Sequence, residues 1–126
     1  MLRHKQGFTL IELLLAVFIL SFGIAGILQL FSQSIISSNT AWDLTVASSH
    51  AEILFEEMQS RKTINSILVE DWVAWGNRND LTTLPQEKIS VEMNNPQIDP
   101  LAVNVIVEWE RNRRAQKAQF QTRFTK

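Results

Sequence analysis

The chain opens with MLRHKQGFTLIELLLAVFIL (residues 1–20), and this stretch decides the fold. Two basic residues, Arg3 and Lys5, lie ahead of an apolar run of 24 residues (8–31). Glu12 is the only charged residue within that run. Roughly 20 apolar residues in a helix are enough to cross the hydrocarbon core of a bilayer. The sequence therefore predicts a single membrane-spanning helix, with the two cations holding its N-terminal end in the cytoplasm.

The rest of the composition limits the class of protein. The 126 residues include no cysteine, so disulfides and thiolate chemistry are excluded. About 95 residues follow the apolar run, which is enough for one small domain with a modest core. Residues 32–110 carry 12 acidic and 4 basic side chains, whereas residues 111–126 carry 6 basic side chains and no acid.

The position of the charged Glu12 within the apolar run requires a physical explanation. An ionised carboxylate at membrane depth costs about 2.5–3.5 kcal/mol, and the chain has no Lys, Arg or His between residues 6 and 49. Cleavage after Gly7 would create the missing cation, because Phe8 would then carry a free α-amine. The i, i+4 spacing places this amine and Glu12 on one helix face. The amine would pair with Glu12 of its own chain or with that of an adjacent copy.

Two other interpretations of the apolar run are open. A cleaved secretory signal would need a shorter apolar core, and GIAG at residues 23–26 offers only a loose cleavage site. A plain signal-anchor helix leaves Glu12 unexplained.

Beyond the membrane the helix is expected to continue over residues 32–59, because residues 32–58 contain no Pro or Gly and apolar residues recur at helical spacing. An ordinary surface helix has one apolar face, but two apolar stripes are predicted here. The second stripe contacts either another molecule or loops of the same chain. The first stripe contains Leu44, Ala47, Ala51, Leu54, Phe55 and Met58, and the second contains Trp42, Val46 and Ile53.

The C-terminal half changes from helical to strand periodicity. A short helix is predicted over residues 64–75, with Thr63 as its N-cap and Gly76 as its stop. Alternating apolar and polar residues predict strands near 88–93, 102–110 and 117–125. We therefore expect an α+β fold, in which a long N-terminal helix packs against a small three-stranded antiparallel sheet.

No catalytic or metal site emerges from the sequence, so we expect a protein that is not an enzyme and has no cofactor. His50 lies near Glu52 and Glu56, but no second His is close, and we expect these side chains to be solvated. The serines of FSQSIISSN (31–39) lack a nucleophile-elbow context. Asp71 is expected to be a helix cap or a surface residue.

A basic cluster crowds the predicted hairpin turn, and such a cluster can contact an anionic partner. No aromatic residue is interleaved to stack on bases, so nucleic acid is an unlikely partner. We expect a solvated hairpin tip, or salt bridges to acidic neighbours. The cluster consists of Arg111, Arg113, Arg114 and Lys117.

The segment KQGFTLIELL (5–14) resembles the processing site of type IV prepilins and of the related pseudopilins of type II secretion. The resemblance implies a leader over residues 1–7 and cleavage between Gly7 and Phe8 by prepilin peptidase, with N-methylation of Phe8. It also implies that Glu12 neutralises the N-terminal amine of a neighbouring subunit during filament assembly. The processing motif further includes Thr9, Leu10 and Ile11.

The remainder of the chain is similar to the type IV pilus modification proteins (PilV type), which are minor pilins. The short processed chain, the absence of a cysteine pair and the absence of Pro in the membrane helix also favour a minor component. The resemblance implies a structural, non-catalytic subunit of the inner membrane. Residues 32–126 would form a periplasmic head that later enters a pilus or pseudopilus with other minor and major pilins and the assembly machinery.

Three alternatives stay open at this point. The first is a minor pseudopilin of type II secretion, and the second is a competence pilin whose basic hairpin touches DNA. The third is a signal-anchored periplasmic binding module or enzyme.

Overall fold

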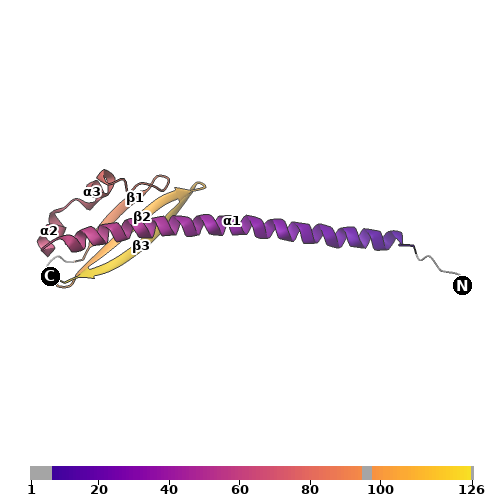
Figure 1. Cartoon of the computed structure of the whole chain (residues 1–126), viewed down its shortest axis with the longest axis horizontal. Helices are drawn as coiled ribbons and strands as arrows, with labels where there is room; N and C mark the ends of the chain where they lie inside the picture. The colour runs from indigo at the N-terminus through magenta and orange to yellow at the C-terminus, as the bar shows by residue number, and fades with distance from the viewer. Residues whose placement is uncertain (1–6, 95–97, 126) are drawn as a thin grey trace. The chain divides into compact units, whose positions relative to one another are not determined.

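In the computed structural model, the described residues are 7–94 and 98–125, so Arg3 and Lys5 lie outside them. The chain divides into two compact units, residues 1–40 and 41–126, and each is described by itself. The elements are α1 (Leu10–Ser60), α2 (Ile64–Val69), α3 (Trp72–Arg78), β1 (Lys88–Met93), β2 (Leu101–Arg111) and β3 (Arg114–Phe124) (Figure 1). The expected α+β fold is confirmed, because one long N-terminal helix is combined with a three-stranded antiparallel sheet.

The N-terminal unit consists of the first part of α1. Its described side chains are all exposed within the chain. An 18-residue window of this helix has a mean hydropathy of 2.5, so it is long and apolar enough to cross a membrane. The hydroxyl of Ser21 donates to the carbonyl oxygen of Val17 at 2.7 Å, which satisfies this polar group inside the helix.

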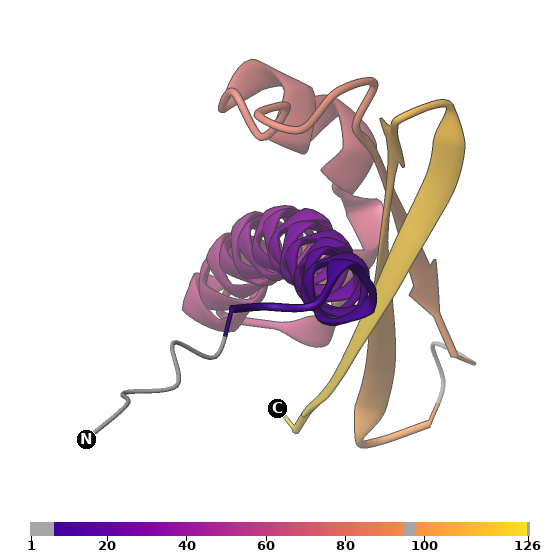
Figure 2. The ribbon, with the colours of Figure 1, turned by 90° about the vertical axis from the view of Figure 1, so that its right-hand side faces the viewer.

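The second unit, which we call the head, begins in α1 at Ala41 and contains the sheet. The strands have the order β1-β2-β3, and both neighbouring pairs are antiparallel. The β2–β3 pairing is unbroken from Leu101 opposite Phe124 to Arg111 opposite Arg114. α3 packs at the β1 edge of the sheet (Figure 2).

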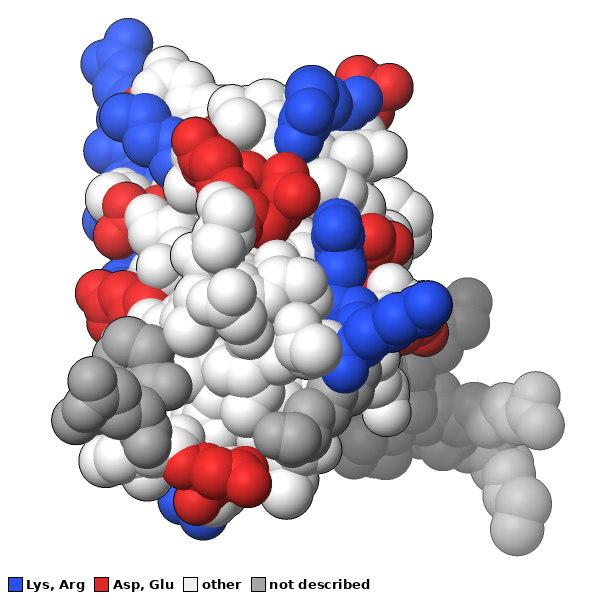
Figure 3. All heavy atoms as spheres, turned by 90° about the vertical axis from the view of Figure 1, so that its left-hand side faces the viewer, with Lys and Arg blue, Asp and Glu red and all other residues white. Residues whose placement is uncertain are grey.

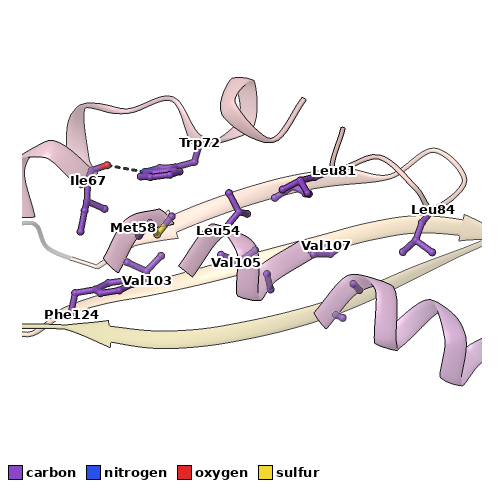
Figure 4. Packing of buried hydrophobic residues seen from close by; sticks show 14 of the residues in the cluster. Leu54, Met58, Ile67, Trp72, Leu81, Leu84, Val103, Val105, Val107 and Phe124 are labelled. Atoms are coloured by element: carbon purple, nitrogen blue, oxygen red, sulfur yellow. Dashed lines mark hydrogen bonds between the residues drawn. The ribbon is translucent and has the colours of Figure 1, made fainter. Parts of the chain in front are cut away.

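The core of the head lies between α1 and the sheet. Ala47, Ala51, Leu54 and Met58 are fully buried, and they pack in one cluster with the inward-facing residues of β2 (Figure 4). Trp72 belongs to this cluster, and its indole N–H donates to the carbonyl oxygen of Ile67 at 2.8 Å. The first predicted stripe therefore forms the core contact. Leu44 is the exception, since it is 44% exposed.

The second predicted stripe is not covered by the chain's own loops, in the part of the head that the structure describes. Trp42 is 64% exposed and Ile53 is 41% exposed, whereas Val46 is half-buried against the core. A contact with another molecule stays a prediction for Trp42 and Ile53.

The single helix predicted over residues 64–75 is wrong. The chain forms two short helices, because Glu70 has an extended backbone and Asp71 begins a new helix as its N-cap. The Asp71 carboxylate accepts a hydrogen bond from the Ala74 backbone N–H at 3.1 Å. Gly76 is not the stop, since it lies buried within α3, which ends at Arg78. Thr63 caps α2 as predicted, and accepts from the Ser66 backbone N–H at 3.3 Å.

The hairpin between β2 and β3 is tighter than the sequence suggested. Asn112 and Arg113 alone form the turn, and both have positive φ, 53° and 61°. Two-residue hairpins of type I′ require this backbone at both positions. The strand predicted over 117–125 therefore begins earlier, at Arg114, and β2 extends to Arg111.

Candidate functional site

The predicted cleavage site lies in non-helical backbone directly ahead of α1. Gly7 and Phe8 are both exposed, and Phe8 exposes 88% of its surface. A Cβ atom at Gly7 would meet no atom of the described residues within 4 Å. Packing against the described residues therefore gives no reason for a glycine at this position, and both residues of the Gly7–Phe8 bond are exposed.

Thr9 and Glu12 form the start of α1. The Thr9 hydroxyl accepts a hydrogen bond from the Glu12 backbone N–H at 3.3 Å, and the Thr9 carbonyl accepts from the Leu13 N–H at 3.2 Å. A threonine followed three residues later by a glutamate is the sequence signature of a capping box. This role of Thr9 was missed by the sequence analysis, although the T-x-x-E spacing contains the signal.

Glu12 lies in the first turn of α1 and is exposed. A negative charge is stabilised there by the helix dipole. None of the salt bridges between described residues involves Glu12. The carboxylate thus lies at the start of a helix, where it could pair with a cation other than those of the described side chains.

The N-terminal segment matches the family model of the prokaryotic N-terminal methylation motif over residues 2–28. This motif is the substrate signal of prepilin peptidase, and the match supports a type IV prepilin-like protein. Together with the apolar helix, it indicates a membrane-anchored, pilin-like chain. The match ends within α1, ahead of the head. No match was found to a curated protein or to a solved structure.

In the head, Asp43 and Arg111 form an ion pair that the sequence analysis did not identify. Asp43 of α1 is almost fully buried, and both oxygens of its carboxylate accept from the Arg111 guanidinium, with an Nε–Oδ2 distance of 2.9 Å. The indole N–H of Trp109 donates to the same Oδ2 at 3.2 Å. The hydrogen bonds from Arg111 hold the pKa of Asp43 below its ordinary value, and Asp43 in turn raises the pKa of Arg111.

The four residues of the predicted basic cluster therefore have different surroundings. Arg111 is neutralised by Asp43, as the salt-bridge alternative anticipated, whereas Arg113, Arg114 and Lys117 are exposed. Lys117 lies opposite Glu108 in the β2–β3 register, so an acid flanks it. Figure 3 shows the opposite end of the head, away from the β2–β3 hairpin, where basic and acidic side chains are intermixed rather than gathered by sign.

His50 is not solvated, contrary to expectation. It is 7% exposed, and its Nδ1 lies 2.5 Å from Oε1 of Glu87, whose side chain is fully buried. The other oxygen of Glu87 accepts from the Leu84 backbone N–H at 2.9 Å. No local pattern could have revealed this pair, because the two residues are 37 positions apart.

Thr83 lies at the other ring nitrogen of His50, with 3.4 Å between its hydroxyl and Nε2. The contact between His50 and Glu87 holds the loop between α3 and β1 against α1. Among the described residues, no group of three or more His, Cys, Asp or Glu side chains is placed to hold a metal ion.

Proposed function

We propose that the chain is a minor pilin, which prepilin peptidase cleaves between Gly7 and Phe8 and which then enters a type IV pilus or primes its assembly. Its role is structural and non-catalytic. The observation that carries the proposal is the combination of the methylation motif with an exposed Gly7–Phe8 peptide bond and a carboxylate in the first helical turn.

Processing and Glu12 form one electrostatic unit in this proposal. Cleavage leaves a cationic amine on Phe8, and a cation at a helix N-terminus is disfavoured by the helix dipole. The Glu12 carboxylate offsets this charge, and the amine in turn offsets the cost of the carboxylate at membrane depth. A neighbouring subunit supplies one member of the pair in the assembled filament, which sets the register between helices.

The proposed topology follows from the same segment. Residues 8–31 cross the inner membrane with the leader (1–7) in the cytoplasm, and the head faces the periplasm. The partners are prepilin peptidase, other minor and major pilins, and the pilus assembly machinery.

A minor pseudopilin of a type II secretion system is the second candidate, because the same processing motif serves both systems. A DNA-binding competence pilin is less well supported, since Asp43 already neutralises Arg111 and leaves a smaller basic surface at the hairpin.

The test is the intact mass of the chain expressed with and without prepilin peptidase. With the peptidase, we expect the loss of residues 1–7 and the gain of one methyl group. Gly7→Val should block the cut, whereas the control Gly26→Val should be processed normally. A Cβ atom at either position meets no atom of the described residues within 4 Å, so neither substitution disturbs their packing. An unchanged wild-type mass in the presence of the peptidase would refute the proposal.

A further inference from the structure

In the part of the chain that the structure describes, the strand β3 forms one edge of the sheet and pairs with β2 alone (Figure 1). It runs for 11 residues, from Arg114 to Phe124, without Pro, Gly or a break in its register. No described backbone hydrogen bond outside the β2 ladder involves β3. A long regular edge presents a row of free N–H and C=O groups, which is a template for another strand.

A groove of about 520 Å³ lies between this edge and α1, within the head. Leu44, which is 44% exposed, and Phe120 give the groove apolar surface. Thr45, Ser48, Ser49 and Glu52 of α1 line it too, and the hydroxyls of Thr45 and Ser49 each donate to an α1 carbonyl four residues earlier, at 2.8 and 3.0 Å. The apolar surface of Leu44 and Phe120 favours an apolar side chain on the inward face of an added strand, and the acidic Glu52 disfavours a carboxylate there.

The outward face of β3 has the opposite character. Lys117 and Arg123 lie there on either side of the exposed Gln119 and Gln121, and β3 contains no acid. In an antiparallel pair of two β3 strands, four cations would share one face, and like charges on neighbouring strands are destabilising. Charge complementarity thus favours a partner strand with carboxylates over a second copy of this chain.

We propose that the β3 edge binds an extended segment of a partner protein, which adds a fourth strand to the sheet. The segment directs apolar side chains into the groove beside Leu44 and Phe120, and carboxylates toward Lys117 and Arg123. Backbone hydrogen bonds supply the affinity and the alternating side chains supply the specificity. The inference requires only the folded head, so it stands or falls independently of prepilin processing.

The first experiment measures fluorescence anisotropy of labelled eight-residue peptides against the full chain in zwitterionic detergent micelles. A peptide of alternating Val and Glu should bind, and one of alternating Val and Lys should not. Failure of the Val/Glu peptide to bind, or equal binding of the Val/Lys peptide, would overturn the proposal.

Charge variants locate the site. Lys117→Glu should weaken binding of the Val/Glu peptide roughly fivefold. Lys88→Glu is a matched control, because Lys88 on β1 also lies opposite Glu108, but at the other edge of the sheet. An equal loss in both variants would contradict binding at β3, and stronger self-association of Lys117→Glu would indicate a second copy instead.

Two N-methylated peptides distinguish strand addition from simple charge attraction. In a ladder, every second residue of the added strand directs its N–H toward β3. One peptide is N-methylated at all Val residues and the other at all Glu residues. One of these two peptides should therefore lose binding, and the other should keep it. Equal behaviour of the two peptides would rule out a fourth strand.

Discussion

At the scale of single residues, Asp43 links the helix of the head to its sheet. Its carboxylate accepts from Arg111 and from Trp109, so its removal leaves two buried or half-buried donors without their acceptor. Breaking a fully buried ion pair costs about 3–5 kcal/mol. The Arg111 side chain retains 36% exposure, so water replaces part of the lost contact.

We predict that Asp43→Ala lowers the free energy of unfolding of the head by about 2 kcal/mol. Urea unfolding of the full chain in micelles, followed by tryptophan fluorescence, measures this change. Glu108→Ala, which removes an exposed acid from β2, should change stability by less than about 0.5 kcal/mol. An equal effect of the two substitutions would contradict a specific role for Asp43.

The same pair predicts a pH dependence. The pKa of Asp43 is lower in the folded chain than its ordinary value of 3.8, so its contribution is fully present above that value. The contribution is lost as pH falls through the depressed folded pKa. The stability difference between wild type and Asp43→Ala should therefore be constant near neutral pH and shrink as the pH falls below about 4.

Most of these contacts between single residues could not be predicted from the sequence. Asp43 and Arg111 are 68 positions apart, and His50 and Glu87 are 37 apart, so only the folded backbone brings them together. Helical spacing predicted which α1 residues face the core, but it could not show that Asp43 and His50 on that helix would find buried partners.

At the scale of elements, periodicity predicted the type of each segment better than its ends. Apolar spacing of i, i+3 and i+4 continues across Glu70 and Asp71, which is why the two helices α2 and α3 read as one. The capping signal of Asp71 was present but competed with that period. The strand types were correct, because apolar and polar residues alternate along all three strands except at Ile106, which is apolar and buried between Val105 and Val107.

The β2–β3 turn gives an element-scale prediction. Arg113 has φ of 61°, a left-handed backbone that disfavours a residue with a Cβ atom. Arg113→Gly should raise the free energy of unfolding by about 0.5–1 kcal/mol. Arg114→Gly removes the same charge from the first residue of β3 and should lower stability instead. Urea unfolding checks both, and a loss of stability in Arg113→Gly would contradict the type I′ turn.

At the scale of the whole molecule, the α+β architecture followed from a change of period along the chain, from helical to alternating. The membrane-spanning length followed from the apolar run. The role of the head in an assembly did not follow from the sequence, because the methylation motif ends at residue 28, ahead of the head.

In the proposed function, Glu12 pairs with a processed N-terminal amine during filament assembly. Glu12→Gln keeps the size of the side chain and removes its charge, whereas Thr9→Ala removes the helix cap, worth about 1 kcal/mol, and keeps the carboxylate. The measurement compares the amount of each variant in sheared filaments with its amount in the membrane, after mass spectrometry has verified processing. We predict that Glu12→Gln remains in the membrane and is depleted from filaments, while Thr9→Ala is incorporated like wild type. Normal incorporation of Glu12→Gln would contradict the account.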